Sequence, residues 1–584
     1  MYSWSVGIDA VLPNDWNVRA SWQQGETHKV TGVMNNYRWD RVTLAIDAVR
    51  QPGTGAIVCN VQLYNPTVAQ LAASVSTRLM SPGGTPGGGG TAKTTVPLGS
   101  PIGMDSTIRD CVPYNVFNSM SAPQQVIDYL GSDIVGDSLL AQDFGEVLLS
   151  GELYEGWSGP ISFAAGLTYR DQNIADGLRN LELDDLGPVV MVPSLGIRGA
   201  GPTATSGSAN LHAFSTLPVV VGGYDVWEYF GELNVPLWES ESGDQTVGGS
   251  TAYRSSQYSS LADKVESWKV GMDVQVFDGL RLRATKSLDV REATFAERFD
   301  AQAGNVFAND PAFNGVSVTT TRVTGGNPNL VPESANTLVA GFVFQPNFSF
   351  LSGLSLSADW YKIDIKDSIS ALGAQRIIND CYSGANKTLC AQVVRGADGY
   401  ITRIFDVFLN VASYRMSGTD YEASYRMEPN FFGNQEESLT IRALAGYQRE
   451  NMDVPYGSTE GINQSGSLNS PDLTGNVTVN YGLGPYSIQL QQHYISDVVI
   501  NTLWVEGRDV DINTAEAYGL TNLRLGYSGE MANGSNWSVA FNASNLLDEA
   551  PPRIAGYGLR GGGQVVGSYD TYGRRYQMSL NMDF

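Results

Sequence analysis

Side chains that commonly carry enzymatic chemistry are few in this chain and are not spaced for it. Its three histidines, His28, His212 and His493, are far apart and show no metal-ligand spacing. Serine-nucleophile, P-loop, zinc-protease and Cys-x-x-Cys motifs are all missing from the sequence. The sequence therefore predicts neither an enzyme nor a cofactor, and we assign no catalytic or metal-binding residue.

Two short stretches match known ligand motifs only in part. Gly556–Gly561 fits a dinucleotide fingerprint, but Pro551–Pro552 precedes it and further glycines follow, where a strand and a helix are required. Asp509–Asn513 begins like a calcium loop, yet Thr514 and Leu520 replace the required glycine and the terminal glutamate. We predict that both stretches are ordinary loops.

The four cysteines fall in two polar segments, Cys59 and Cys111 in one and Cys381 and Cys390 in the other. Four cysteines allow three pairings. Pairing within each segment is favoured, because sulfurs in separate loops would rarely come within bonding distance. Each bond would contribute about 2–4 kcal/mol to the stability of its loop, and disulfides indicate an oxidising compartment.

The composition excludes several classes of protein. Among 584 residues there are 36 Lys and Arg against 60 Asp and Glu, a net charge of −24, and 16% of residues are charged. This acidic balance disfavours nucleic acid as a partner, because a phosphate backbone is bound by Lys and Arg. The 28 Tyr, 20 Phe and 11 Trp argue against disorder. Long apolar runs are missing, which excludes membrane-spanning helices, and residues 1–20 lack a signal-peptide pattern.

Apolar and polar residues alternate along most of the chain. Within 268–276, for example, every even-numbered residue is apolar and every odd-numbered residue is polar or glycine. This period indicates β-strands, and only 122–130 and 374–378 have a helical pattern. We therefore predict an all-β chain with 17 strands. They lie near 2–12, 16–24, 145–154, 160–171, 225–237, 247–257, 266–277, 280–289, 336–345, 353–366, 405–428, 438–449, 474–481, 485–495, 519–529, 537–547 and 574–584.

The connections between these strands alternate between short turns and mostly long loops. A soluble sandwich would bury the apolar faces, whereas a membrane barrel turns them to lipid and has short turns at one end and long loops at the other. The polar faces, His493 among them, would then line a wet interior, and aromatic residues lie near strand ends as in a membrane girdle. We predict a transmembrane antiparallel β-barrel. Its long extracellular loops are expected near 25–144, 172–224, 290–335, 367–404, 497–518 and 548–573.

The strand near 353–366 changes its apolar face. Apolar residues occupy even positions up to Trp360 and odd positions from Tyr361 to Ile365. Either a β-bulge lies at this point, or the strand leaves the membrane and packs against an outer loop.

An odd strand number is unusual, since bacterial single-chain barrels have even numbers. If the short turns are periplasmic, the last strand runs toward the periplasm, and counting back places Met1 outside the cell. We therefore expect an odd number of upstream strands, together with a signal peptide, to precede this sequence in the intact protein.

Five segments in the second half of the chain carry recognisable motifs: 280–299, 326–333, 357–365, 542–548 and 573–584. In their order and spacing they resemble the TonB-dependent outer-membrane receptors of Gram-negative bacteria, whereas residues 1–279 agree in pattern more than in motif. The residues that match the family's loop motif are Gly326, Asn327, Pro328, Leu330, Pro332 and Glu333. On the last strand, Tyr576, Met578, Leu580, Met582 and Phe584 share one face. The resemblance implies that this face is the signal read by the barrel-assembly machinery, the alternative being an ordinary amphipathic strand.

The resemblance also implies a barrel of about 22 strands and an amino-terminal plug domain that contacts the TonB complex. We find no plug in residues 1–584 and expect this chain to be a partial barrel. The implied function is uptake of a scarce nutrient, a ferric siderophore or an oligosaccharide, by a monomer embedded in outer-membrane lipid and driven through TonB. The alternatives are a plugless porin-like channel, a nonfunctional remnant or, from another class, a secreted all-β adhesin.

Overall fold

The computed structural model describes most of the chain. The described residues are 1–34, 37, 39–63, 110–117, 122–131, 133–178, 221–299, 301–348, 351–384, 386–396, 399–433, 436–454, 461–531, 534–552 and 569–582. Among them, no helix is long and apolar enough to cross a membrane.

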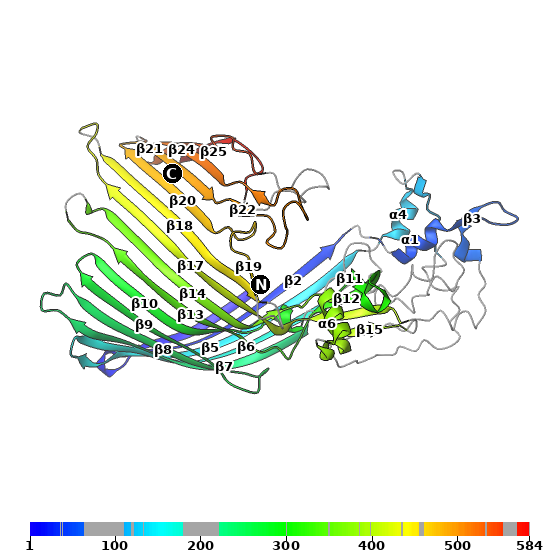
Figure 1. Cartoon of the computed structure of the whole chain (residues 1–584), viewed down its shortest axis with the longest axis horizontal. Helices are drawn as coiled ribbons and strands as arrows, with labels where there is room; N and C mark the ends of the chain where they lie inside the picture. Colours follow the sequence, from blue (N-terminus) through cyan, green and yellow to red (C-terminus); the bar gives the residue numbers. More distant parts are fainter. Residues whose placement is uncertain are drawn as a thin grey trace.

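One curved antiparallel sheet of 18 strands forms the body of the molecule (Figure 1). Its strands are β1 (Tyr2–Val11), β2 (Asn17–Val33), β5 (Ile134–Gly156), β6 (Gly159–Leu178), β7 (Val221–Glu239), β8 (Thr246–Tyr258), β9 (Val265–Phe277), β10 (Leu280–Arg291), β13 (Glu333–Phe344), β14 (Leu354–Ser370), β17 (Leu409–Met427), β18 (Glu437–Val454), β19 (Ile462–Asn463), β20 (Leu473–Leu483), β21 (Tyr486–Ile495), β24 (Tyr518–Glu530), β25 (Asn536–Ser544) and β26 (Arg575–Met582). Apart from the two-residue β19, these are the 17 strands that the sequence predicts.

Each long strand pairs with the next long strand along the chain, from β1 through to β26. Within the described part of the chain, no pairing joins β1 to β26. Short turns such as the 3-10 turn Pro13–Asp15 connect strands at one end of the sheet. We call this end the turn edge and the opposite end, which carries the longer connections, the loop edge.

The two faces of the sheet differ as the alternation predicts. Large apolar side chains on one face, here called the outer face, are exposed: Ile8 is 70% exposed, Val270 52% and Met578 76%. A soluble protein rarely exposes so much contiguous apolar surface, and a membrane barrel must expose it to lipid. The opposite, inner face is polar.

Additional elements lie at the loop edge, where Figure 1 shows the helices and small sheets gathered. They are α1 (Trp39–Ile46), β3 (Ala48–Arg50), β4 (Ile57–Cys59), η2 (Asn60–Leu63), α4 (Gln124–Leu130), α5 (Phe295–Phe299), β11 (Ala301–Asp310), η7 (Pro311–Phe313), β12 (Val316–Gly325), α6 (Ala374–Ser383), η9 (Lys387–Gln392), β15 (Val393–Arg395), β16 (Ile401–Val407), β22 (Val498–Val499) and β23 (Thr514–Ala515). The two helical segments expected at 122–130 and 374–378 are confirmed as α4 and α6.

Two details of the strand prediction were wrong. The segment expected as one strand near 405–428 is divided at Phe408, because residues 401–407 pair with β12 in a separate four-stranded sheet and not with the large sheet. Several strands also run past their predicted ends, so that β2 reaches Val33 and β5 begins at Ile134, inside the predicted loop 25–144.

The change of face on β14 is resolved by its register. Residues Leu354 to Ile365 pair with β17 without interruption, so no bulge lies between Trp360 and Tyr361. Lys362 and Asp364 therefore continue the outer face above Trp360, while Tyr361 and its apolar successors point inward. The outer face of β14 therefore changes from apolar to charged residues at this point, without a bulge.

Candidate ligand-binding and transport surface

The inner face carries ion pairs that join different strands of the sheet. Arg283 on β10 donates to Asp359 on β14, with 2.8 Å between Nε and Oδ1, although β13 lies between them. The residue of β13 in register with both is Gly341, which has no side chain to obstruct the contact. A similar pair joins Arg19 on β2 to Asp9 on β1, with 2.7 Å between Nε and Oδ1. Such partly exposed pairs contribute little stability, and they give the inner wall a hydrated, polar character.

The histidines have ordinary positions. His493 lies on the inner face opposite Asn476, with 3.3 Å between its Nδ1 and the amide nitrogen of Asn476. The ring nitrogen Nε2 of His28 lies against the carboxylate of Asp137, across β2 and β5. His212 lies outside the described residues.

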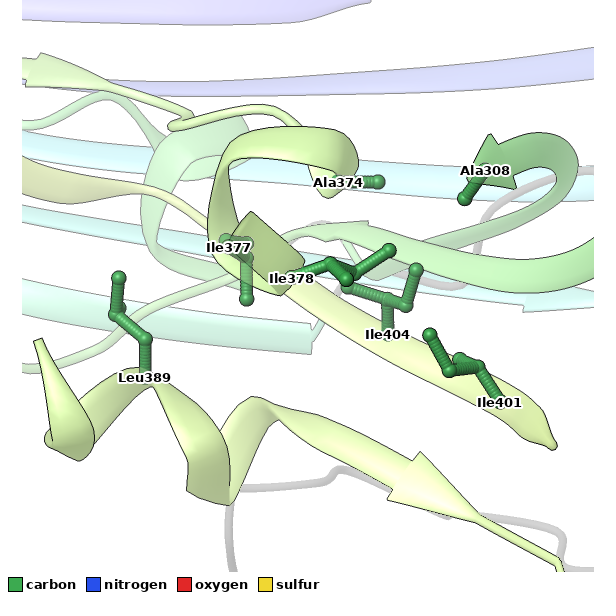
Figure 2. Close-up of a cluster of buried hydrophobic side chains, with 7 residues drawn as sticks. All are labelled: Ala308, Ala374, Ile377, Ile378, Leu389, Ile401 and Ile404. Atoms are coloured by element: carbon green, nitrogen blue, oxygen red, sulfur yellow. The ribbon is translucent and has the colours of Figure 1, made fainter. Parts of the chain in front are cut away.

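Two connections at the loop edge combine into one folded unit, which we call the loop cap. Strands β11 and β12 come from the connection between β10 and β13, and β15 and β16 from the connection between β14 and β17. The two halves join through parallel pairing of β12 with β16. Their shared core is shown in Figure 2 and consists of Ala308, Ala374, Ile377, Ile378, Leu389, Ile401 and Ile404.

Two buried aspartates stabilise the loop cap. Asp310 accepts two hydrogen bonds from Arg395, of 2.6 and 3.0 Å, which hold the pKa of this carboxyl below its usual range. Asp406 accepts from Nε of Arg322 at 2.7 Å and from the backbone N–H of Gly373 at 3.0 Å. Because each buried carboxylate has charged and backbone donors, the cap is a specific fold and not a collapsed loop.

Disulfides join Cys59 to Cys111 and Cys381 to Cys390. These are the two pairings within loops that the sequence favours. The second bond connects α6 to η9 inside the loop cap.

Replacing both Cys381 and Cys390 by serine is expected to destabilise the loop cap by about 2–3 kcal/mol, because the bond closes a short loop. Limited proteolysis of the protein in detergent should then cleave residues 367–404 faster while the barrel strands stay intact. The matched control replaces Cys59 and Cys111, which should leave cleavage of 367–404 unchanged. Equal cleavage of wild type and the Cys381/Cys390 variant would contradict the expected role.

The loop motif Gly326–Glu333 is anchored by an arginine whose role the sequence alone does not indicate. The Arg298 side chain is fully buried; it forms an ion pair with Glu292 and donates to the carbonyl oxygens of Pro328 at 2.8 Å and Leu330 at 2.9 Å. Arg298 lies in the 280–299 segment quoted for the family resemblance, but its partners are revealed only by the structure.

Two asparagine side chains connect the same motif by hydrogen bonds to the backbone near β14 and β17. The Asn327 amide donates to the carbonyl oxygen of Phe408 at 2.8 Å. The Asn410 amide donates to the carbonyl oxygens of Val331 at 2.7 Å and Asp367 at 2.8 Å. The motif, which belongs to the connection between β10 and β13, is therefore joined to both ends of the connection between β14 and β17.

The remaining motif residues complete this junction. Leu330 is buried with Ala293 and Ile369. Glu333 pairs with Arg291, which also binds Glu297 at 3.0 Å. Burial by itself would raise the pKa of Glu297, but its hydrogen bonds with Arg291 and Thr294 hold it below the usual range.

An arginine on the inner face lies among aromatic rings near the loop edge. Tyr224 stacks on Phe295 with ring centroids 5.4 Å apart and approaches Tyr258 at 5.9 Å. Arg170 is opposite Val226 on β7, and its buried Nε has no hydrogen-bond partner among the residues that the structure describes. This enclosure combines a cation with flat apolar surfaces, which suits an anionic aromatic ligand.

The four described outward residues of the last strand, Tyr576, Met578, Leu580 and Met582, are all exposed on the outer face of β26. Phe584 lies outside the described residues.

Comparison with known proteins identifies the family. Residues 112–546 match the model described as "TonB dependent receptor-like, beta-barrel". The chain belongs to the TonB-dependent receptor β-barrel family. It is therefore an outer-membrane protein, and the exposed apolar face of its sheet is the lipid-facing surface. No curated protein matches it by sequence.

Several solved structures share this fold. The siderophore receptor PirA from Acinetobacter baumannii has a TM-score of 0.52 at 13% identity, over 99% of this chain and 61% of PirA. A mutant of the ferric enterobactin receptor PfeA from Pseudomonas aeruginosa, in complex with enterobactin, has a TM-score of 0.53 at 12% identity, over 99% and 61%. The RagAB peptide transporter has a TM-score of 0.50 at 12% identity, over 99% and 61%. This TonB-dependent receptor barrel thus spans 61% of the length of these relatives.

Proposed function

We propose that this chain is the barrel portion of a receptor that takes up a scarce nutrient across the outer membrane, with energy supplied through TonB by way of a plug domain. In this proposal the loop edge faces the cell exterior, the loop cap contacts the nutrient, and the polar inner face lines its path. The outward face of β26, with Phe584, would serve recognition by the barrel-assembly machinery. The large exposed apolar face of the sheet is unsuited to a secreted adhesin.

A ferric siderophore is the ligand that the inner face favours. The observation that carries this choice is Arg170, whose buried Nε has no partner in the described part of the chain and which lies near Tyr224 and Tyr258. An anionic chelate with flat rings would be attracted by the positive charge of the half-buried Arg170 guanidinium and pack against these aromatic side chains.

An oligosaccharide is favoured by a different feature, at the outside of the loop cap. Phe313 and Tyr400 stack with ring centroids 4.3 Å apart, and Tyr400 is exposed. Sugar rings pack their apolar faces against such exposed aromatic side chains. The two ligand classes therefore predict dependence on different residues.

Uptake by cells that express the receptor should separate these possibilities. With radiolabelled ferric siderophores, Arg170→Gln is expected to lower initial uptake about tenfold, as loss of one charge-assisted hydrogen bond implies, whereas Tyr400→Ala should leave it unchanged. If labelled oligosaccharides were taken up instead, and Tyr400→Ala lowered that uptake while Arg170→Gln did not, the second ligand class would be favoured.

The same assay tests energy coupling. Uptake should stop in cells that lack TonB, and a flux that persists without TonB would support the porin-like channel instead. Failure of either substrate to enter, with the barrel correctly inserted, would support the nonfunctional remnant.

A further inference from the structure

The outer face of β14 becomes basic beyond Trp360, and beside it on β10 Lys286 is an outward lysine between Ala284 and Leu288. On β14, Lys362 and Lys366 follow Trp360 on the outer face, and on β10 Lys286 follows Leu282 and Ala284. Arg415 of β17 is on the same face, opposite Asp364. We call Lys286, Lys362, Lys366 and Arg415 the basic patch. It lies where the lipid-facing surface ends at the loop edge.

Two of these lysines form a pair across one strand. Leu338 of β13 is in register with Lys286 on one side and with Lys362 on the other. Two strand spacings place the two lysine backbones about 10 Å apart. Their long side chains can converge on one group between them or reach two groups of one headgroup.

The basic patch has more positive charge than its carboxylates neutralise. Asp364 pairs with Lys362 at 3.5 Å and with Arg415 at 3.2 Å, and Glu450 approaches Arg415 at 3.6 Å. Lys286 and Lys366 form no ion pair with any residue that the structure describes. Four cations therefore face two carboxylates, in a chain whose net charge is −24.

On three strands of the other side of the sheet, the equivalent outward position is acidic. Beyond the aromatic residues Tyr169 and Trp227, the outward residues of β5, β6 and β7 are Asp143, Asp171 and Asp225, in register with one another. A cluster of outward basic residues is thus not a general property of this boundary, although a single lysine, Lys264, lies over the ring of the outward Tyr229, 5.7 Å from its centroid.

We propose that the basic patch binds the phosphate groups of a membrane lipid headgroup. Lysines at the edge of a lipid-facing surface extend along it to reach headgroup phosphates, and Leu338 and Trp360 beside them offer apolar contacts for the upper acyl chains. The leaflet concerned rests on the proposed orientation, which places the basic patch in the outer leaflet. The partner is a lipid and not free phosphate, because the patch adjoins the apolar outer face and not the inner wall.

Native mass spectrometry of the chain in detergent, titrated with phosphatidylglycerol, tests this assignment. Wild type is expected to retain bound lipid. The variant Lys286→Gln/Lys362→Gln should bind it about 25-fold more weakly, from about fivefold for each lysine near an anionic headgroup. The matched control is Lys269→Gln on the neighbouring strand β9, which removes the same charge from the inner face and should not change binding.

If Lys269→Gln weakened phosphatidylglycerol binding as much as the double variant, the lipid would be attracted by overall charge, and the proposal would be overturned. Unchanged lipid binding by the double variant would also overturn it. Displacement of the lipid by millimolar inorganic phosphate would show that the patch binds free phosphate, which also overturns it. Lipid retention is measured without any nutrient. The lipid proposal can therefore fail while TonB-dependent uptake is observed, and uptake can fail while lipid is retained.

Discussion

Replacing Arg298 by methionine is expected to release the loop motif from the barrel and destabilise the loop edge by about 3–5 kcal/mol, the cost of leaving one partner of a buried ion pair uncompensated. The change removes the only described partner of the Glu292 carboxylate and two donors to the carbonyl oxygens of Pro328 and Leu330. Hydrogen exchange in detergent should rise steeply over residues 292–332 and 367–410, while the strands near the turn edge keep their protection.

The matched control is Arg508→Met, because Arg508 is 70% exposed and, within the described ranges, forms an ion pair only with the adjacent Asp509. Its exchange pattern should equal that of wild type. If Arg298→Met left protection at the motif unchanged, Arg298 would not be the anchor, and the asparagine contacts would have to hold the motif alone.

Substituting valine for Gly341 should weaken the barrel wall itself. A Cβ at this position would collide with the Asp359 carboxylate and lie 2.5 Å from the carbonyl oxygen of Ala358. The backbone of β13 or β14 would have to move, and Arg283 would lose its contact across β13. Overpacking of this kind costs about 1–3 kcal/mol, which should lower the midpoint of urea unfolding in lipid vesicles, followed by tryptophan fluorescence.

Gly231→Val on β7 controls for adding a branched side chain to a strand, since a Cβ there has no atom within 4 Å. It should unfold at the same urea concentration as wild type. A shift as large as that of Gly341→Val would show that loss of glycine in any strand is responsible, and not the contact between Arg283 and Asp359.

Strand positions could be predicted from the sequence because each strand of a lipid-facing barrel has its own alternation of apolar and polar residues. Trp268 to Val276 alternate strictly since one face meets lipid and the other a polar interior, and no distant contact is needed to read this. The same pattern revealed the change of face after Trp360, although only the register excluded a bulge as its cause.

The loop cap could not be predicted in the same way. The core packs Ala308 from the connection between β10 and β13 against residues such as Ile377 and Ile404 from the connection between β14 and β17, so it forms only when two connections, separated by two long strands, come together. The parallel pairing of β12 with β16 is equally non-local. Short alternating runs at 316–325 and 401–407 were a usable signal for strands, but not for which strands pair. The role of Arg298 was hidden for a related reason, since its acceptors are backbone carbonyls, which any residue provides.

The pairing of β12 with β16 also limits how these loops can change in evolution. Surface loops normally accept insertions and deletions freely, because their length affects nothing else. Here Thr321 is in register with Arg403 and Gly325 with Val407, so a residue gained in one connection shifts it against the other and turns side chains away from the common core. The lengths of the two connections must therefore change together, and variation should concentrate in the turns at their tips.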